Sequence, residues 1–342
     1  MSTLPIFEFA TAKNLKQALS ALGPGWTDSV AYAGGVDLLD LMKERLTEPK
    51  RLVNIKQAGE LKYIRSEADG SIRIGPLVTL AEIAAHDELA RAFPAFARAC
   101  GKAATPQVRN LATIGGNLCQ RPRCWYFRRE EFPCLRKGGG KCFAREGENR
   151  YHAIFTEGEP CVIVNASTPA VALVALDARL RISSASGEKT IPVAKFFVRP
   201  KDNVHRETIL MPSELITEII LPGEARAMRQ AYLKLREKQS YDWPMAECAA
   251  AALLDGTTVR EIRIVLGAAA PVPRRAEEAE KFVTGKPLTE ETARKAGELA
   301  VAGAAPLSQN GYKMQLFPVL VRRTLQELAG LRGRSVRYVE SA

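Results

Sequence analysis

Four cysteines are spread along a basic segment in the middle of the chain and could act as soft metal ligands. They are Cys124, Cys134, Cys142 and Cys161, which lie ten, eight and nineteen residues apart. Thiolates favour zinc or iron–sulfur clusters, but the close C-x-x-C pairs typical of zinc and ferredoxin sites are missing. The spacing therefore predicts a metal site without identifying the metal, and unrelated free thiols or a disulfide stay open as the alternative.

The other cysteines and the histidines form no second metal pattern. Cys119 could be a spare ligand, but we expect it to pack near a cofactor because it follows a glycine turn. Cys100 and Cys248 lie in apolar stretches and are expected in the core. The three histidines are scattered, with no spacing for a metal site or a nucleophilic triad; they are His86, His152 and His205.

Positive charge is concentrated around the four cysteines. The chain carries a formal net charge of +11, and the segment Arg121–Arg150 holds nine Lys or Arg against four Asp or Glu. Such an excess could attract nucleic acid, a membrane surface or an acidic partner, and a solvated basic face is an equal alternative. Basic residues beside thiolates would also favour an anionic cluster and raise its reduction potential. The residues with this expected role are Arg121, Arg123, Arg128, Arg129 and Lys141.

Two glycine turns could bind an anion. The turn Ala33–Leu39 follows an expected strand and opens an expected helix, so its backbone N–H groups can approach a phosphate, although a purely structural turn would look similar. The turn Thr113–Asn117 adds a hydroxyl and an amide that could bond phosphate or a flavin edge. Neither fits the G-x-G-x-x-G fingerprint. Together they predict a cleft for a long dinucleotide.

The elements that must position these residues form an α+β pattern in three parts, because apolar runs of strand length alternate with amphipathic segments. With 342 residues and 46% apolar content the chain can form two or three domains. The expected domains are 1–57, 58–221 with an insertion at about 119–161, and 226–335, with a linker at Pro222–Arg226.

The same patterns predict individual elements. Strands are expected at Ile6–Phe9, Val30–Ala33, Leu52–Ile55, Ile72–Ile74, Ala178–Ile182, Leu215–Leu221 and Ile262–Leu266. Helices are expected at Asn14–Leu22, Leu38–Leu46, Leu80–Ala85, Phe93–Gly101, Ala170–Leu176, Met245–Leu254, Arg275–Val283, Glu290–Ala302 and Lys313–Glu327.

The chain by itself is expected to be cytoplasmic and without membrane insertion. Its opening, Met1–Pro5, leads into folded-looking sequence with no charged and apolar leader, and no run is long enough to span a bilayer. Seven cysteines are too few for a disulfide scaffold. A periplasmic location would require co-export with a signal-bearing partner.

Three segments, Ala33–Leu39, Ala112–Asn117 and Gly267–Ala276, resemble the FAD-binding subunit of molybdenum hydroxylases, the xanthine dehydrogenase and carbon monoxide dehydrogenase group. The resemblance covers essentially the whole chain. It implies a PCMH or vanillyl-alcohol-oxidase-type FAD-binding fold in two subdomains, followed by a smaller C-terminal α+β domain. It also implies a complex with a molybdopterin-binding large subunit and a [2Fe-2S] small subunit, as a heterotrimer or its dimer.

The cysteine insertion is similar to one in the flavoprotein subunits of periplasmic aldehyde oxidoreductase and 4-hydroxybenzoyl-CoA reductase, where it holds an additional [4Fe-4S] cluster. Arg123–Phe127 and the spacing from Cys161 to Leu176–Ala178 carry this match. The resemblance implies Cys124, Cys134, Cys142 and Cys161 as cluster ligands and leaves Cys119 out.

The resemblance also implies the contacts to FAD. Val36 stands where the group usually has Thr, and Thr168 stands where an acidic residue is common, which puts flavin potential and acceptor choice in question. Lys234 would stabilise an anionic reduced flavin, with a solvated lysine as the equal alternative. The implied contacts are Tyr32, Ala33, Gly34, Gly35, Val36, Asp37, Leu38, Leu39, Thr105, Thr113, Gly116, Asn117, Ile216 and Lys234.

These observations predict an electron-transfer subunit of a molybdenum-dependent aldehyde or aromatic oxidoreductase. Electrons would arrive singly through iron–sulfur centres, and FAD would pass them in pairs to an external acceptor, while substrate would react on a partner subunit. A basic nucleic-acid-binding protein with a structural metal loop is one alternative, but it leaves the glycine turns unexplained. A stand-alone flavin oxidase of the same fold is another.

Overall fold

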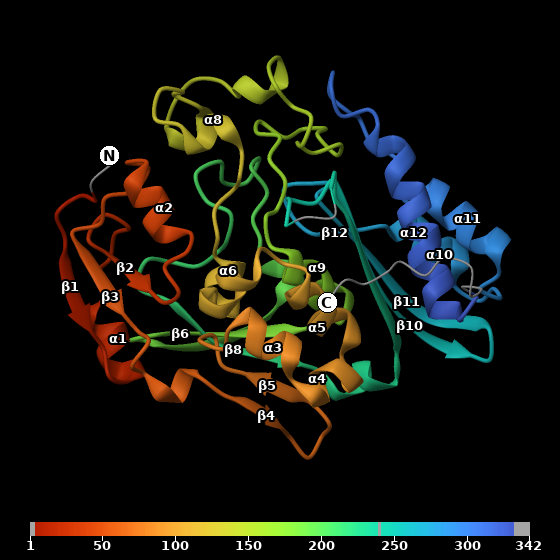
Figure 1. Ribbon diagram of the computed structural model, residues 1–342, viewed down its shortest axis with the longest axis horizontal. Helices are drawn as coiled ribbons and strands as arrows, with labels where there is room; N and C mark the ends of the chain where they lie inside the picture. Colours follow the sequence, from red (N-terminus) through yellow and green to blue (C-terminus); the bar gives the residue numbers. More distant parts are fainter. Residues whose placement is uncertain (1–3, 239–240, 332–342) are drawn as a thin grey trace.

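The computed structural model describes residues 4–238 and 241–331 and builds this part of the chain around three β-sheets (Figure 1). The first sheet is parallel, with strand order β1-β3-β2, and is flanked by α1 (Leu15–Ala21) and α2 (Leu38–Lys43). Its strands are β1 (Glu8–Thr11), β2 (Ser29–Tyr32) and β3 (Arg51–Asn54). Since β2 runs directly into the first glycine turn, this sheet fixes the start of that turn.

The second sheet is antiparallel and lies beneath a layer of helices (Figure 1). Its strand order is β4-β5-β8-β6-β7, which brings Leu215–Leu221 beside strands from much earlier in the chain. The strands are β4 (Ile64–Ser66), β5 (Ile72–Ile74), β6 (Arg179–Ser184), β7 (Gly187–Pro192) and β8 (Leu215–Leu221). The helices are α3 (Leu80–Ala85), α4 (Asp87–Ala92), α5 (Pro94–Gly101), α6 (Pro106–Leu111), α7 (Ile114–Leu118) and α9 (Thr168–Ala175).

Helix α9 is the central element of this second part. Phe96 of α5, Leu173 of α9 and Ile219 of β8 are fully buried in one apolar cluster. Every residue of α9 is buried because two strands of the C-terminal part, β10 (Ala246–Asp255) and β11 (Thr258–Gly267), cover it as well. The two parts therefore share a packed interface.

The cysteine segment, residues 119–161, is a flap with little regular structure. It contains the single turn α8 (Trp125–Arg128) and two short 3₁₀ turns, Leu135–Lys137 and Phe143–Arg145. The flap lies at the top of Figure 1 and reaches from α2 toward the C-terminal part. Backbone hydrogen bonds close its turns and join Ile154 and Phe155 to the carbonyl of Ala269, and side-chain contacts attach other parts of it.

The C-terminal part is a four-stranded antiparallel sheet covered by helices. The sheet is β9 (Arg229–Leu235), β10 (Ala246–Asp255), β11 (Thr258–Gly267) and β12 (Arg274–Arg275), in the order β12-β11-β10-β9. The helices are α10 (Glu277–Val283), α11 (Glu290–Leu299) and α12 (Lys313–Ala329).

The predicted helix Met245–Leu254 is wrong, because this stretch forms strand β10. Its alanines favour a helix in isolation, but the strand is buried on both faces. Ala249 and Ala251 pack into the cluster around α9, while Ala250 and Ala252 pack into the cluster around α12. Small side chains let helices approach both faces, so tertiary packing overrides the local preference.

The predicted linker Pro222–Arg226 stays a prediction, and the stretch is packed against the rest of the chain. It belongs to a 3₁₀ segment, Gly223–Ala227, in which Ala225 is buried, and a Cβ on Gly223 would lie 2.2 Å from the carbonyl oxygen of Asp69. Most other expected elements are present with ends shifted by a few residues. The strands β4, β7, β9 and β12 and the short helices α4, α6, α7 and α8 were not foreseen.

The proposed domain limits stay predictions, and residues 332–335 of the last one lie outside the described residues. No helix in the described part of the chain combines the length and apolarity needed to cross a bilayer.

Replacing Ala250 by Leu tests the packing of β10. We expect the variant to lose about 1–3 kcal/mol of folding stability, because added methylenes would push β10 and α12 apart. The control is Leu253→Ala on the same strand, where the side chain is 39% exposed and the change should stay within about 0.5 kcal/mol. Urea unfolding of both variants measures the effect, and equal midpoints would contradict this packing.

Candidate functional site

A cavity of about 750 Å³ lies where the first sheet, the helical layer and the flap meet. Its volume falls within the roughly 300–1,000 Å³ typical of cofactor sites. Of the implied flavin contacts, Tyr32 and Leu39 are not part of its lining. The structure brings the others together around it: Ala33, Gly34, Gly35, Val36, Asp37, Leu38, Thr105, Thr113, Gly116, Asn117, Ile216 and Lys234.

The first glycine turn forms a cradle of bare backbone. A Cβ on Gly34 would lie 2.1 Å from the carbonyl oxygen of Leu111, just before the second turn. Gly35 has a φ of 72°, which side chains rarely adopt, and a Cβ there would collide with the Tyr32 ring. The close approach to Leu111 requires glycine at position 34, and the backbone conformation and the Tyr32 ring require it at position 35. This close approach fits a group held by backbone N–H contacts, such as a diphosphate.

The second glycine turn is fixed by hydrogen bonds from its own side chains. Thr113 caps α7 by accepting from the backbone N–H of Gly116 at 3.2 Å. The side-chain oxygen of Asn117 accepts from the Ser167 hydroxyl at 2.7 Å, which orients the amide and its donor NH₂ group. Both residues line the large cavity. They offer polar contacts of the kind a flavin or diphosphate requires.

Lys234 is buried rather than solvated, so the solvated alternative is wrong. Its side chain is 5% exposed, and its Nζ lies 3.9 Å from Glu247 and donates to the carbonyl of Lys102. Burial lowers the pKa of Lys234, and the attraction to Glu247 opposes this. Glu247 also accepts from the Thr168 hydroxyl at 2.6 Å. An acidic residue therefore lies directly behind Thr168, supplied by β10.

The four predicted cysteine ligands line one cavity. Cys124, Cys134, Cys142 and Cys161 come together there from separate turns of the flap. Cys119 instead lines the large cavity, and Cys100 and Cys248 are buried in the core as expected. All seven cysteines are free thiols, so the disulfide alternative has no support in the structure.

The cysteine-lined cavity offers four thiols as donors. Among the described residues, no three His, Cys, Asp or Glu side chains lie close enough to hold one metal ion. A cubane takes one thiolate at each iron, so its ligands stand further apart than those of one tetrahedral ion. The cysteine-lined cavity measures about 10 Å³, room for about one water.

The surroundings of one of the four cysteines, Cys142, favour its thiolate form. The thiol of Cys161 donates to Cys142, which lowers the pKa of Cys142 to about 6 and raises that of Cys161. Burial raises the pKa of Cys124 to about 11. The positive charges that oppose burial come from Arg145 near Cys142 and Arg136 near Cys161.

The basic residues expected beside the cluster have other contacts. Arg121 pairs with Glu207, Arg123 and Arg128 pair with Asp37, and Arg128 also reaches Asp40. At the surface, Arg129 pairs with Glu131 and Lys141 covers the ring of Phe143. The expected effect of these five residues on a cluster stays a prediction.

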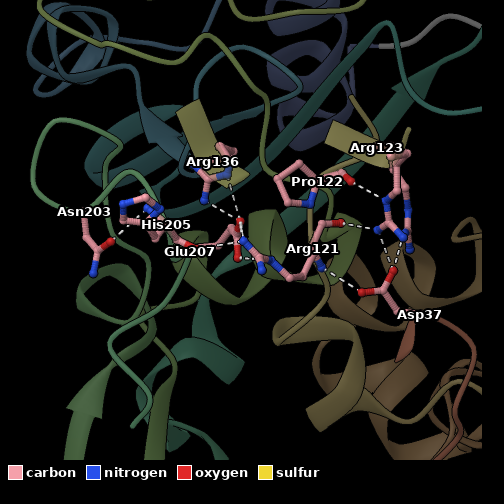
Figure 2. Close-up of polar contacts among 9 residues, drawn as sticks. Asp37, Arg121, Pro122, Arg123, Arg136, Asn203, His205 and Glu207 are labelled. Carbon is pink, nitrogen blue, oxygen red and sulfur yellow. Dashed lines mark hydrogen bonds and ion pairs between the residues drawn. The ribbon is translucent and has the colours of Figure 1, made fainter. Parts of the chain in front are cut away.

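Two carboxylates attach the flap to the rest of the molecule (Figure 2). Asp37, in the first glycine turn, accepts from the backbone N–H of Arg121 at 2.9 Å and from the side chains of Arg123 and Arg128. Burial alone would raise the pKa of Asp37, but the two guanidinium groups outweigh it and hold this pKa below its usual value. The carboxylate thus stays charged, which keeps the flap and the glycine turn joined.

Glu207 forms the second attachment (Figure 2). It accepts from Arg121 at 3.0 Å and from Arg136, whose side chain is 1% exposed. The same Arg121 donates to the carbonyl of His205 at 2.8 Å. Arg121 and Arg136 belong to two different stretches of the flap. The carboxylate of Glu207 therefore joins these two stretches.

Comparisons with known proteins agree with this geometry. The model of the FAD binding domain in molybdopterin dehydrogenase matches residues 5–224, and that of the CO dehydrogenase flavoprotein C-terminal domain matches residues 230–328. The chain is 35% identical to the aldehyde oxidoreductase FAD-binding subunit PaoB of Escherichia coli (strain K12), over 86% of this chain and 88% of that one. It is 28% identical to the carbon monoxide dehydrogenase medium chain of Hydrogenophaga pseudoflava, over 94% and 96%.

Solved structures show the same fold. Carbon monoxide dehydrogenase from Hydrogenophaga pseudoflava, lacking the Mo-pyranopterin moiety, matches with a TM-score of 0.75 at 28% identity, covering 96% of this chain and 99% of that one. Quinoline 2-oxidoreductase from Pseudomonas putida 86 has the same TM-score at 22% identity, covering 96% and 98%.

The fold and the cleft define an FAD-binding flavoprotein with two glycine turns and a separate C-terminal domain. The chain belongs to the family of FAD-binding subunits of the xanthine dehydrogenase type of molybdenum hydroxylases. The predicted fold class and the family resemblance are thereby confirmed, and the chain is an oxidoreductase subunit.

Three important residues were missed from the sequence. Glu207 and Glu247 lie far along the chain from their partners, and His152, set aside as scattered, lies 3.2 Å from the sulfur of Cys124. Burial lowers the pKa of His152 to about 4. Its closeness to the four cysteines in sequence was the one available signal.

Replacing Gly34 by Ala tests the contact between the glycine turns. The new Cβ would collide with a backbone oxygen, so we expect a loss of about 1–3 kcal/mol and less bound flavin per chain. In the control Gly59→Ala, a Cβ meets nothing within 4 Å and flavin content should be normal. Flavin absorbance per protein gives the measurement, and full flavin in Gly34→Ala would argue against this cradle.

Replacing Glu207 by Gln tests the attachment of the flap. Because Arg136 would be left buried without a counter-charge, we expect a loss of about 3 kcal/mol and faster proteolysis within residues 119–161. Glu130→Gln removes the same charge from an exposed flap position and should have little effect. Limited proteolysis and thermal unfolding report both, and identical behaviour of the two variants would exclude this role for Glu207.

Proposed function

We propose that this chain is the electron-transfer flavoprotein subunit of a molybdenum-dependent aldehyde or aromatic oxidoreductase, and that Cys124, Cys134, Cys142 and Cys161 hold a [4Fe-4S] cluster. Its partners are a molybdopterin-binding large subunit and a [2Fe-2S] small subunit, in a heterotrimer or its dimer. The observation that carries the proposal is the convergence of the four cysteines on one cavity of a flap anchored at the flavin cleft.

The relatives support the class of reaction. The relative at 35% identity is an FAD-binding subunit of an aldehyde oxidoreductase, and another at 28% is a medium chain of carbon monoxide dehydrogenase. Both are covered over most of their length. A subunit of this kind leaves substrate chemistry to its partners.

When bound, FAD accepts two electrons and an iron–sulfur cluster carries one at a time. The chain holds the two groups close together. Arg121 and Arg123 line the flavin cavity, and Cys124 follows directly in the chain. A ligand of the cluster is thus one peptide bond from a residue of the flavin cleft, so the route between the two sites is short.

Other residues of the cleft bind and orient the flavin. The glycine turns hold the diphosphate through backbone N–H groups, and Asn117 presents a fixed amide. Lys234 supplies a buried positive charge partly balanced by Glu247. A buried ammonium stabilises negative charge on a nearby ring more strongly than an exposed one because the surroundings screen it less.

The nucleic-acid alternative loses its main support. Arg121, Arg123, Arg128 and Arg136 are engaged by carboxylates within the molecule. The basic excess of the flap therefore serves internal attachment, and these side chains do not form an open basic face.

Replacing Cys134 by Ser tests the cluster. In the purified complex we expect about four fewer irons per chain, because a cubane needs all its thiolates, with molybdenum and flavin unchanged. Cys119→Ser is the matched control, since this thiol lines the flavin cavity and not the cysteine cavity; it should keep its iron. Iron, molybdenum and flavin analysis measures the result, and full iron in Cys134→Ser would refute the proposed ligand set.

A further inference from the structure

His152 is buried beside one of the four cysteines. Its Nε2 lies 3.2 Å from the sulfur of Cys124, and the residue is 4% exposed. The other ring nitrogen, Nδ1, has no hydrogen-bond partner among residues 4–238 and 241–331. The contact to sulfur is therefore the one polar interaction that the structure gives this ring.

The C-terminal domain holds the backbone of His152 in place. The carbonyl of His152 accepts from Lys313 Nζ at 2.9 Å and from Asn310 Nδ2 at 3.1 Å, and both of these residues are fully buried. The next residue, Ala153, donates its N–H to Val162, which follows Cys161. Contacts on both sides thus fix the position of the ring relative to the cysteines.

A neutral imidazole carries a single N–H, on one nitrogen or the other. On Nδ1 that hydrogen would be buried without an acceptor, which is costly. On Nε2 it points to the sulfur of Cys124, and a thiolate is an acceptor. The arrangement favours the tautomer with its hydrogen on Nε2.

We propose that His152 donates an Nε2–H···S hydrogen bond to Cys124 when this thiolate ligates the cluster, and that this bond raises the reduction potential of the cluster. The inference rests on the proposed function, since it requires the cluster. The physical reason is charge: reduction adds an electron to an anionic centre, and a hydrogen bond to a ligand sulfur stabilises the more negative state. His152 is a positioning and tuning residue that holds no iron itself.

The test compares His152→Leu with His152→Gln in the purified complex. Leucine removes the donor at similar size, whereas the glutamine amide keeps an N–H. We expect full iron in both, with the potential of the cluster lowered in His152→Leu by about 59 mV, a tenfold change in a one-electron equilibrium. His152→Gln should lie closer to the unaltered complex. A potentiometric titration followed by electron paramagnetic resonance gives these values.

His205→Leu is the control, because this side chain is exposed and its loss should leave the potential unchanged. Full iron with an unchanged potential in His152→Leu would overturn the inference. If that variant loses iron, electron–nuclear double resonance of the unaltered complex in H₂O and D₂O decides: an exchangeable proton coupled to the cluster supports the bond, and its absence overturns it. An unaltered complex without the extra irons would instead refute the proposed function, before any variant is measured.

Discussion

The ion pairs of Asp37 and Glu207 with flap arginines are the constraint on which the site depends. The flap consists of short turns, and these ion pairs attach it to the first glycine turn and to the segment around Glu207. Burying an unpaired guanidinium or carboxylate is unfavourable, and the partners offset that cost only while both are in place. Asp37 also belongs to the first glycine turn, which lines the flavin cavity. One residue thereby links the shape of the flavin cleft to the position of the cysteines.

The C-terminal domain provides the opposite anchor. Lys313 donates to the carbonyls of Tyr151, His152 and Ala268, and Asn149 of the flap donates to Ser308. Lys313 has no carboxylate partner in these contacts, and burial lowers its pKa to about 7. Backbone carbonyls therefore stabilise its ammonium form, and the contacts require that the two domains be packed together. Ion pairs with Asp37 and Glu207 hold one end of the flap, and hydrogen bonds from Lys313 to the backbone carbonyls of Tyr151 and His152 hold the other.

Local sequence explains which parts of this arrangement could be predicted. Glycine turns and cysteines can be recognised from residue type alone. The residues around the cavity and the grouping of four thiols could therefore be predicted. Their partners were not, because Arg121 and Glu207 are 86 residues apart in sequence and Thr168 and Glu247 are 79 apart. The helix predicted for the stretch that forms β10 was wrong for the same reason. Its alanines prefer a helix locally, and burial between α9 and α12 makes the stretch a strand.

Charge shows most clearly how the sequence can mislead. The flap carries a basic excess that fits nucleic acid, a membrane surface or an anionic cluster equally well in sequence. In the fold, four of its arginines pair with two carboxylates contributed by distant segments. The charge of Arg136 also opposes the rise in the pKa of Cys161. Arg136 thus links the attachment of the flap to the electrostatics of the cysteines. Glu207 holds its guanidinium in place by an ion pair, and the charge of the same guanidinium favours the thiolate form of Cys161.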